Sequence, residues 1–214
     1  MKGLLVKDLR LLLSQSRFYI ILLIVLFVSG TSTQATFVSG YIAVVFPMFA
    51  VSTISYDEYD NGNAFLFTLP FSRKEYVLAK YIFGLLLCVF GNILGTSLVV
   101  IQGIMTHSLD MEMMISSQFG TILSSVLVLS IMFPLQFKFG AEKSRVALIA
   151  VIGSIFFIVT VGVKIIEKLN VELSWLNVLW NNDYLLLGVL AFIVILFIIF
   201  SIKMSMKIML KKEL

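Results

Sequence analysis

Few residues in this chain have the type and spacing needed for catalysis or metal binding. His107 is the only histidine, with Asp110 and Glu112 nearby. A metal centre would need a further strong ligand, so we predict a surface loop here and no metal site. The single cysteine, Cys88, lies in an apolar run, which indicates a packing role. No G-x-S-x-G, H-E-x-x-H or G-x-x-x-x-G-K-[ST] motif is present. We therefore expect no catalytic site, no cofactor and no nucleotide-binding domain in this chain.

A second group of polar residues interrupts the long apolar runs without carrying charge. These residues include Asn92, Thr96, Gln102 and Gln136, along with several serines. Hydrogen bonds between neighbouring helices are one explanation for them, and the lining of a substrate path is the other. Ionisable residues are expected only at the ends of the runs, which argues against a proton- or ion-coupled pump.

Residues 67–76, FTLPFSRKEY, combine several signals for the start and end of helices. Pro70 disfavours helix at the residue before it, so it should end a short helix formed by the preceding residues, NAFLFTL. Ser72 and Glu75 then match the S-x-x-E capping box that begins a new helix. The sequence thus predicts a short helix, a proline stop and a capped restart.

This short helix should hold apolar side chains at the surface of the protein, namely Phe65, Leu66, Phe67, Leu69 and Phe71. Aromatic side chains on the surface of a protein are typically covered either by the membrane surface or by a groove of another protein. Asp57 and Glu58, which close the preceding apolar run, place the segment at a membrane boundary.

The elements that position these residues are predicted to be membrane helices. The chain is 60% hydrophobic and only 13% charged, whereas soluble domains carry about 25% charged residues. Six continuous apolar runs approach the roughly 20 residues that a spanning helix needs, and continuous runs favour helices over a barrel. We predict an all-α integral membrane protein, a single transmembrane domain over residues 1–214, with spans at residues 18–31, 37–55, 76–105, 117–137, 146–166 and 184–202.

Basic residues indicate the orientation of these spans. All of them except Lys164 and Lys168 lie in the N-terminal segment, the links between spans two and three and between spans four and five, and the C-terminal tail. The positive-inside rule therefore places both termini in the cytoplasm. The net charge of +4 reflects this anchoring at membrane lipids, so we expect no nucleic-acid partner.

Two further segments are expected at the membrane surfaces. Residues 1–16 form an amphipathic pattern with Leu5, Leu9, Leu12 and Leu13 on one face, which predicts an interfacial helix or an extension of the first span. Residues 167–183 hold both tryptophans and are too short and too polar to span. We predict an extracellular interfacial or re-entrant segment there.

The acidic pair after the second span, followed by FLFTLPFSRKEYVLAKY, resembles the small ABC type 2 transporter permeases. Their pattern is roughly two acidic residues, a spacer and L-x-x-L-P-[VIF]-[ST]-R-x-x-[IVY]-V-x-x-K. The matching residues are Asp57, Glu58, Leu66, Leu69, Pro70, Ser72, Arg73, Val77 and Lys80. Size and general character are also similar to the export permeases for amphipathic peptides, including the phenol-soluble modulin and antimicrobial-peptide exporters of Gram-positive bacteria.

The resemblance implies a subunit of an ATP-driven exporter in the bacterial cytoplasmic membrane. Residues 56–75 would form the coupling segment that docks on a separate cytoplasmic ABC ATPase, and that partner would bind ATP and Mg²⁺. The coupling residues would be Asp57, Glu58, Phe65, Leu66, Phe67, Leu69, Pro70, Ser72, Arg73 and Glu75. A second permease copy, identical or related, would complete the transmembrane part. The outer gate would comprise Trp175, Leu176, Leu179 and Trp180.

A transport path without buried charge favours amphipathic or hydrophobic cargo. We expect peptides such as phenol-soluble modulins or antimicrobial peptides to pass Asn92, Thr96, Gln102 and Gln136. Drugs and lipids are the alternative cargoes. A membrane scaffold or sensor without transport activity is the alternative from another class of function.

Overall fold

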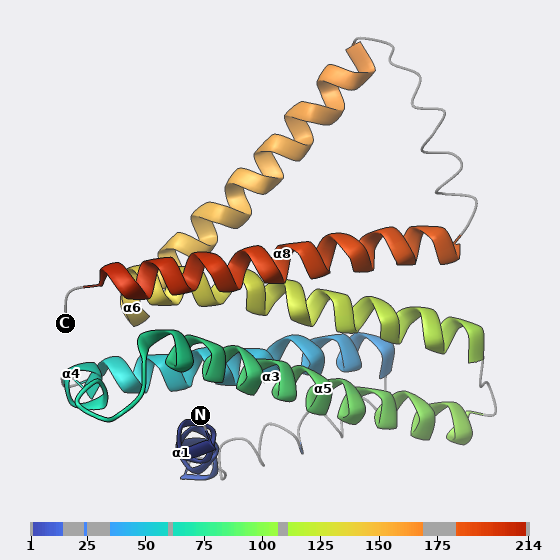
Figure 1. The fold of residues 1–214 in the computed structure, drawn as a ribbon. Coiled ribbons are helices and arrows are strands. Elements are labelled where there is room, and N and C mark those ends of the chain that lie inside the picture. Colours follow the sequence, from blue (N-terminus) through green and yellow to red (C-terminus); the bar gives the residue numbers. More distant parts are fainter. Residues whose placement is uncertain are drawn as a thin grey trace.

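The computed structural model describes residues 2–14, 24, 35–59, 62–106, 111–168 and 183–212, and within these residues it contains helices and no strand. The helices are α1 (Lys2–Ser14), α3 (Ala35–Glu58), α4 (Gly62–Leu66), α5 (Arg73–Met105), α6 (Met111–Lys168) and α8 (Asp183–Lys211). Figure 1 shows α3, α5, the first part of α6 and α8 lying side by side as a bundle. The prediction of an all-helical fold is confirmed for the described residues.

Four helices in the described residues are long and apolar enough to cross a membrane: Ala35–Glu58, Arg73–Met105, Met114–Gly140 and Leu185–Lys211. They overlap the second, third, fourth and sixth predicted spans. The first predicted span, residues 18–31, lies outside the described residues except for Ile24. The fifth, residues 146–166, falls within the second part of α6.

The link expected between the fourth and fifth spans is a sharp bend within α6. Gly140 has φ 73° and ψ −177°, a backbone conformation that is essentially restricted to glycine. The helix resumes directly after it, and Figure 1 shows the following residues, in orange, leaving the bundle at a steep angle. The predicted link between spans four and five is therefore helical on both sides of Gly140.

Two glycines let α3 and α5 approach each other closely. A Cβ atom at Gly91 would lie 2.8 Å from the Cβ of Phe46, and one at Gly95 would lie 3.0 Å from the Cβ of Ser39. Ordinary carbon–carbon contacts lie at about 3.5–4.0 Å. The G-x-x-x-G pattern of residues 91–95 thus packs against a helix of the same chain, as small-residue motifs do in membrane proteins.

The short helix α1 crosses the bundle instead of extending it. Figure 1 shows α1 end-on while the long helices are seen from the side, so its axis is nearly perpendicular to theirs. The predicted leucine face of α1 is divided: Leu5 and Leu12 pack on the core, whereas Leu9 and Leu13 are exposed. α4, the N-terminal helix and the C-terminal end of α8 lie at the same end of the bundle.

Aromatic side chains form the core at this end. The ring of Tyr81 lies 4.7 Å from that of Phe133, and Phe137 lies 6.1 Å from Phe133 and 6.2 Å from Tyr76, measured between ring centroids. All four side chains are almost fully buried. Edge-to-face contacts of this kind fix the rotation of α5 relative to α6, and α5 carries most of the residues described next.

Candidate functional site

The turn between α3 and α5, which we call the α4 turn (residues 62–72), contains the predicted short helix and capped restart, but the helix ends before the residue that precedes Pro70. α4 ends at Leu66, and the chain turns once more through a bond donated by the Leu69 amide to the Leu66 carbonyl, 3.2 Å. The Ser72 amide then donates to Glu75 Oε2 at 2.8 Å, and the Glu75 amide donates to Ser72 Oγ at 3.2 Å. This reciprocal pair is the predicted capping box. The capping box fixes the residue at which α5 begins, and it thereby fixes the direction in which the α4 turn leaves α5.

The predicted coupling residues divide into an exposed and an inward-facing group. Phe65 is 72% exposed and Leu69 is 43% exposed, and the Pro70 and Ser72 side chains are also exposed. Leu66 and Asp57 are buried. The remaining residues are partly buried, namely Glu58, Phe67, Arg73 and Glu75. The first group presents the most side-chain surface to a partner, and the coupling role itself stays a prediction.

Arg73 ties the α4 turn to the end of α8. Its Nη1 atom donates to the carbonyl oxygens of Met209, Leu210 and Lys212 at 3.1, 3.2 and 2.8 Å. The first two carbonyls belong to the last turn of α8 and the third follows directly after it, where the helix dipole favours a cation. The guanidinium also lies 5.7 Å from the centre of the Phe67 ring. Arg73 therefore stabilises the turn from inside, a role that its motif position did not indicate.

A buried ionic cluster joins α1, α3 and α5, and we define it as Lys7, Asp8, Asp57 and Lys80. Lys80 Nζ lies 2.8 Å from Asp8 Oδ1 and 2.7 Å from Asp57 Oδ2. Lys7 Nζ contacts Asp57 Oδ1 closely and lies 3.3 Å from Asp8 Oδ1. Asp8 and Lys80 are 0% and 1% exposed. Each lysine thus contacts both aspartates, and the four charges cancel within the cluster.

Two neutral groups complete the cluster. The Tyr76 hydroxyl donates to Asp57 Oδ2 at 2.8 Å, and Lys80 Nζ donates to Thr53 Oγ1 at 2.9 Å. Asp8 Oδ2 is buried and has no hydrogen-bond partner among the described residues. Because removing one member of a buried ion pair leaves an uncompensated charge, such a change costs about 3–5 kcal/mol.

The sequence did not predict this cluster. Lys80 lies seven residues after the start of α5 and is almost fully buried, which its position near the start of the predicted third span did not indicate. Asp8 carried a usable signal, because it is four residues from both Leu4 and Leu12 on the inward face of α1. A lone acidic residue on an apolar face indicates a buried partner of opposite charge.

Glu58 follows Asp57 but points to different partners. Its Oε1 atom accepts from Lys212 Nζ at 2.7 Å, which ties the end of α3 to the end of α8. Its Oε2 atom lies 3.3 Å from the position that a Cβ atom would take at Gly140. The two acidic residues of the motif therefore face different elements: Asp57 contacts α1, and Glu58 lies beside the bend of α6.

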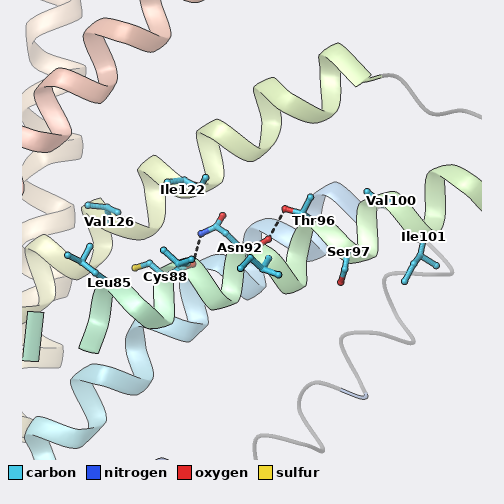
Figure 2. A pocket seen from close by; sticks show the side chains of 11 residues that line it. Leu85, Cys88, Asn92, Thr96, Ser97, Val100, Ile101, Ile122 and Val126 are labelled. Carbon is cyan, nitrogen blue, oxygen red and sulfur yellow. Dashed lines mark hydrogen bonds between the residues drawn. The ribbon is translucent and has the colours of Figure 1, made fainter. Parts of the chain in front are cut away.

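An open groove of about 840 Å³ lies along α5 and the first part of α6 (Figure 2). Its lining is mainly aliphatic, with Asn92, Thr96 and Ser97 as polar members. Asn92 Nδ2 donates to the Cys88 carbonyl at 2.8 Å and to Ser125 Oγ at 3.3 Å. The lining residues in the described part of the chain carry no charge.

The four predicted path residues are not brought together. Asn92 and Thr96 line the groove, and Thr96 also donates to Gln118 Oε1 on α6 at 3.0 Å. Gln102 accepts from the Ala35 amide at 3.0 Å, at the far end of α5. Gln136 donates to Ser55 Oγ at 3.0 Å, near the bend of α6. All four make helix-to-helix hydrogen bonds, and Asn92 and Thr96 alone also border the groove.

The remaining predictions concern residues that the structure does not describe. The predicted outer gate, Trp175, Leu176, Leu179 and Trp180, lies outside the described residues, as do His107 and Asp110. These predictions stay as the sequence states them.

Comparison with models of protein families identifies the family of this chain. A family model described as "ABC-2 family transporter protein" matches residues 3–210, which is nearly the whole chain. No curated protein matches the chain.

Proposed function

This chain belongs to the ABC-2 family of transporter proteins, and from that premise we propose that it is the six-span permease of a bacterial exporter driven by a separate ABC ATPase. Family membership makes it a membrane permease of an ABC transporter, which is a transport component and not itself an enzyme. It also implies an ABC ATPase as a partner. The contact with that ATPase, the topology and the cargo are the proposed parts.

The exposed apolar edge of the α4 turn is the observation that carries the proposal. Phe65 and Leu69 project from a turn that the capping box and Arg73 hold in place. Large apolar residues presented on a fixed backbone are typical anchors of protein interfaces. The turn connects α3 to α5 along the chain, so a partner that binds Phe65 acts on both helices. This edge is the proposed ATPase contact.

The arrangement of the ends supports a topology with both termini in the cytoplasm. α1, α4 and the C-terminal end of α8 share one end of the bundle, and this end carries the lysines of α8. α1 is nearly perpendicular to the spans and exposes Val6, Leu9 and Leu13 on its outer side. Such a helix fits the surface of the inner leaflet, with the apolar side chains among lipids. Residues 18–31 and 146–166 supply the first and fifth of the six spans.

The groove supports an apolar or amphipathic cargo. Its aliphatic walls with Asn92 and Thr96 provide hydrogen bonds but no ion pair, so a charged group would enter without compensation. We propose amphipathic peptides, such as phenol-soluble modulins or antimicrobial peptides, as the cargo, with drugs and lipids as the alternative. A second copy of the chain, or a related permease, would complete the path.

The test compares Phe65→Ser with Phe37→Ser, because both phenylalanines are highly exposed, at 72% and 75%. Phe37 lies near the start of α3, at the opposite end of that helix from the α4 turn. Loss of an interface anchor costs about 2 kcal/mol or more, which is roughly a 30-fold loss of affinity. Co-purification of the ATPase should therefore fall sharply for Phe65→Ser and persist for Phe37→Ser. Equal recovery of the ATPase with both variants would show that Phe65 is not part of the ATPase contact.

Cargo is tested separately with purified complex in proteoliposomes. An amphipathic helical peptide should raise ATP hydrolysis and accumulate across the membrane, because transport couples the two. A rate of ATP hydrolysis that does not change when peptides, drugs or lipids are added would favour a scaffold or sensor instead.

A further inference from the structure

The ionic cluster lies on a continuous chain of contacts that begins at the α4 turn. The Phe67 ring follows the exposed Phe65 by two residues and lies 5.5 Å from the Tyr76 ring, edge to face. Tyr76 in turn donates its hydroxyl to Asp57 at 2.8 Å. Asp57 contacts both lysines of the cluster, and these lysines contact Asp8 of α1.

We propose that this route transmits movement of the α4 turn to α1, with Tyr76 and the ionic cluster as its positioning residues. The inference rests on the proposed docking of an ATPase at the α4 turn. In this route the Asp8–Lys80 ion pair holds α1 to the bundle. The Tyr76 hydroxyl connects this ion pair, through Asp57, to the α4 turn. None of these residues lines the groove. Their role is to make α1 follow the turn.

The pairing pattern of the ionic cluster allows α1 to shift relative to α3 and α5. Each lysine already contacts both carboxylates, so a small shift of α1 exchanges partners without leaving a charge unpaired. Asp8 Oδ2 is a buried acceptor without a partner among the described residues, which leaves a place for one lysine to move to. An element with two discrete arrangements is what physical coupling between sites requires.

An apolar contact would hold α1 less specifically. α1 packs on the core through Leu4, Leu5 and Leu12, and apolar side chains tolerate sliding because their contacts are non-directional. The Asp8–Lys80 pair has one short contact at 2.8 Å, and both side chains are almost fully buried. It therefore supplies a directional link between α1 and α5, as buried polar groups do in coiled coils.

The first test reverses the charges on purified permease alone. Asp8→Lys leaves three lysines facing Asp57, and Lys80→Asp leaves three aspartates facing Lys7, whereas the double variant restores two charges of each sign. Hydrogen–deuterium exchange of α1 in lipid nanodiscs should accelerate at least tenfold in each single variant. It should return to within about threefold of the wild-type rate in the double variant. The exposed Arg10→Asp is the control on the same helix, with no change expected. Absence of rescue in the double variant would show that ion pairing does not hold α1.

The second test separates transmission from simple structural support. Tyr76→Phe removes the hydroxyl bond to Asp57, and Tyr81→Phe is the matched control, because Tyr81 is a buried tyrosine of the same helix that bonds Ser201 and Ser205 of α8. In the complex with a co-purified ABC ATPase, ATP should change α1 exchange at least threefold in wild type. Tyr76→Phe should lose at least half of that change, and Tyr81→Phe should keep it.

The possible outcomes distinguish the inference from the proposed function. Equal behaviour of the two tyrosine variants, or no effect of ATP on α1 exchange in the wild-type complex, would overturn transmission through this route. Failure of any ABC ATPase to associate with wild-type permease would instead refute the proposed docking. In that case the charge-reversal series still decides whether the ionic cluster holds α1.

Discussion

Gly91→Ala tests whether the contact between α3 and α5 is as close as the structure shows. The added Cβ atom would lie 2.8 Å from the Cβ and 2.9 Å from the Cγ of Phe46. Rotation of the Phe46 side chain does not relieve the first contact, because the position of Cβ is fixed by the backbone. The helices must therefore separate locally by about 0.7–1.2 Å to reach an ordinary contact of about 3.5–4.0 Å.

The magnitude follows from two opposing effects. Overpacking of a closely packed site costs about 1–3 kcal/mol of unfolding free energy. Replacing glycine by alanine inside a helix gains about 0.8–1.0 kcal/mol at the same time. Gly120 provides the matched control, since it is exposed on α6 and a Cβ atom there would meet nothing within 4 Å. Both variants share the propensity gain, so the difference between them isolates the steric cost of about 1–3 kcal/mol.

The assay is unfolding of the purified permease in mixed micelles with increasing sodium dodecyl sulfate. Gly91→Ala should have a lower unfolding free energy than Gly120→Ala by the steric cost. Gly95→Ala should also be less stable than Gly120→Ala, because its Cβ atom would lie 3.1 Å from the Ser39 carbonyl oxygen. Gly91→Ala and Gly120→Ala with stabilities equal within about 0.5 kcal/mol would refute the close contact, because overpacking costs at least about 1 kcal/mol.

Three further variants test other parts of the structure. Gly140→Ala should lower the unfolding free energy by about 1–3 kcal/mol, because alanine is strained at φ 73° and ψ −177°; wild-type stability would contradict the bend. Arg73→Lys keeps the charge but loses the contact with three carbonyls, so the end of α8 should become more sensitive to protease, by about 1.5–3 kcal/mol of local stability; an unchanged cleavage rate would show that the contact is dispensable. Asn92→Leu should reduce peptide transport in proteoliposomes while ATPase co-purification persists, and unimpaired transport would place the cargo path elsewhere than the groove.

The local features of the α4 turn could be predicted from the sequence because short-range chemistry determines them. A capping box needs only Ser72 and Glu75 three residues apart. The short helix ends at Leu66, three residues before the stop that Pro70 predicted at Leu69. The four observed apolar helices were likewise predictable, since bilayer thickness sets their length. These features do not depend on how the helices pack.

The ionic cluster and the α6 bend could not be predicted because they depend on packing between distant segments. Lys80 and Asp8 are 72 residues apart, and nothing local indicates that α1 turns back onto α5. Gly140 sits between two apolar runs, where a polar loop and a sharp helical bend have similar sequences. The Glu58 carboxylate lies 3.3 Å from where a Cβ atom at Gly140 would be, so the surroundings of the bend include a residue 82 positions away in the sequence.

The position of these features along α5 suggests how force would reach the cargo in the proposed exporter. Ser72 caps the start of α5, Lys80 joins the ionic cluster, and Asn92 borders the groove. Lys80 and Asn92 are twelve residues apart, which is about 18 Å along one uninterrupted helix. The described lining of the groove has no charged residue that could respond directly to a change at the α4 turn. Movement of α5 as a rigid rod, carrying α1 with it through the cluster, is therefore the simplest way for a partner at the turn to alter the groove.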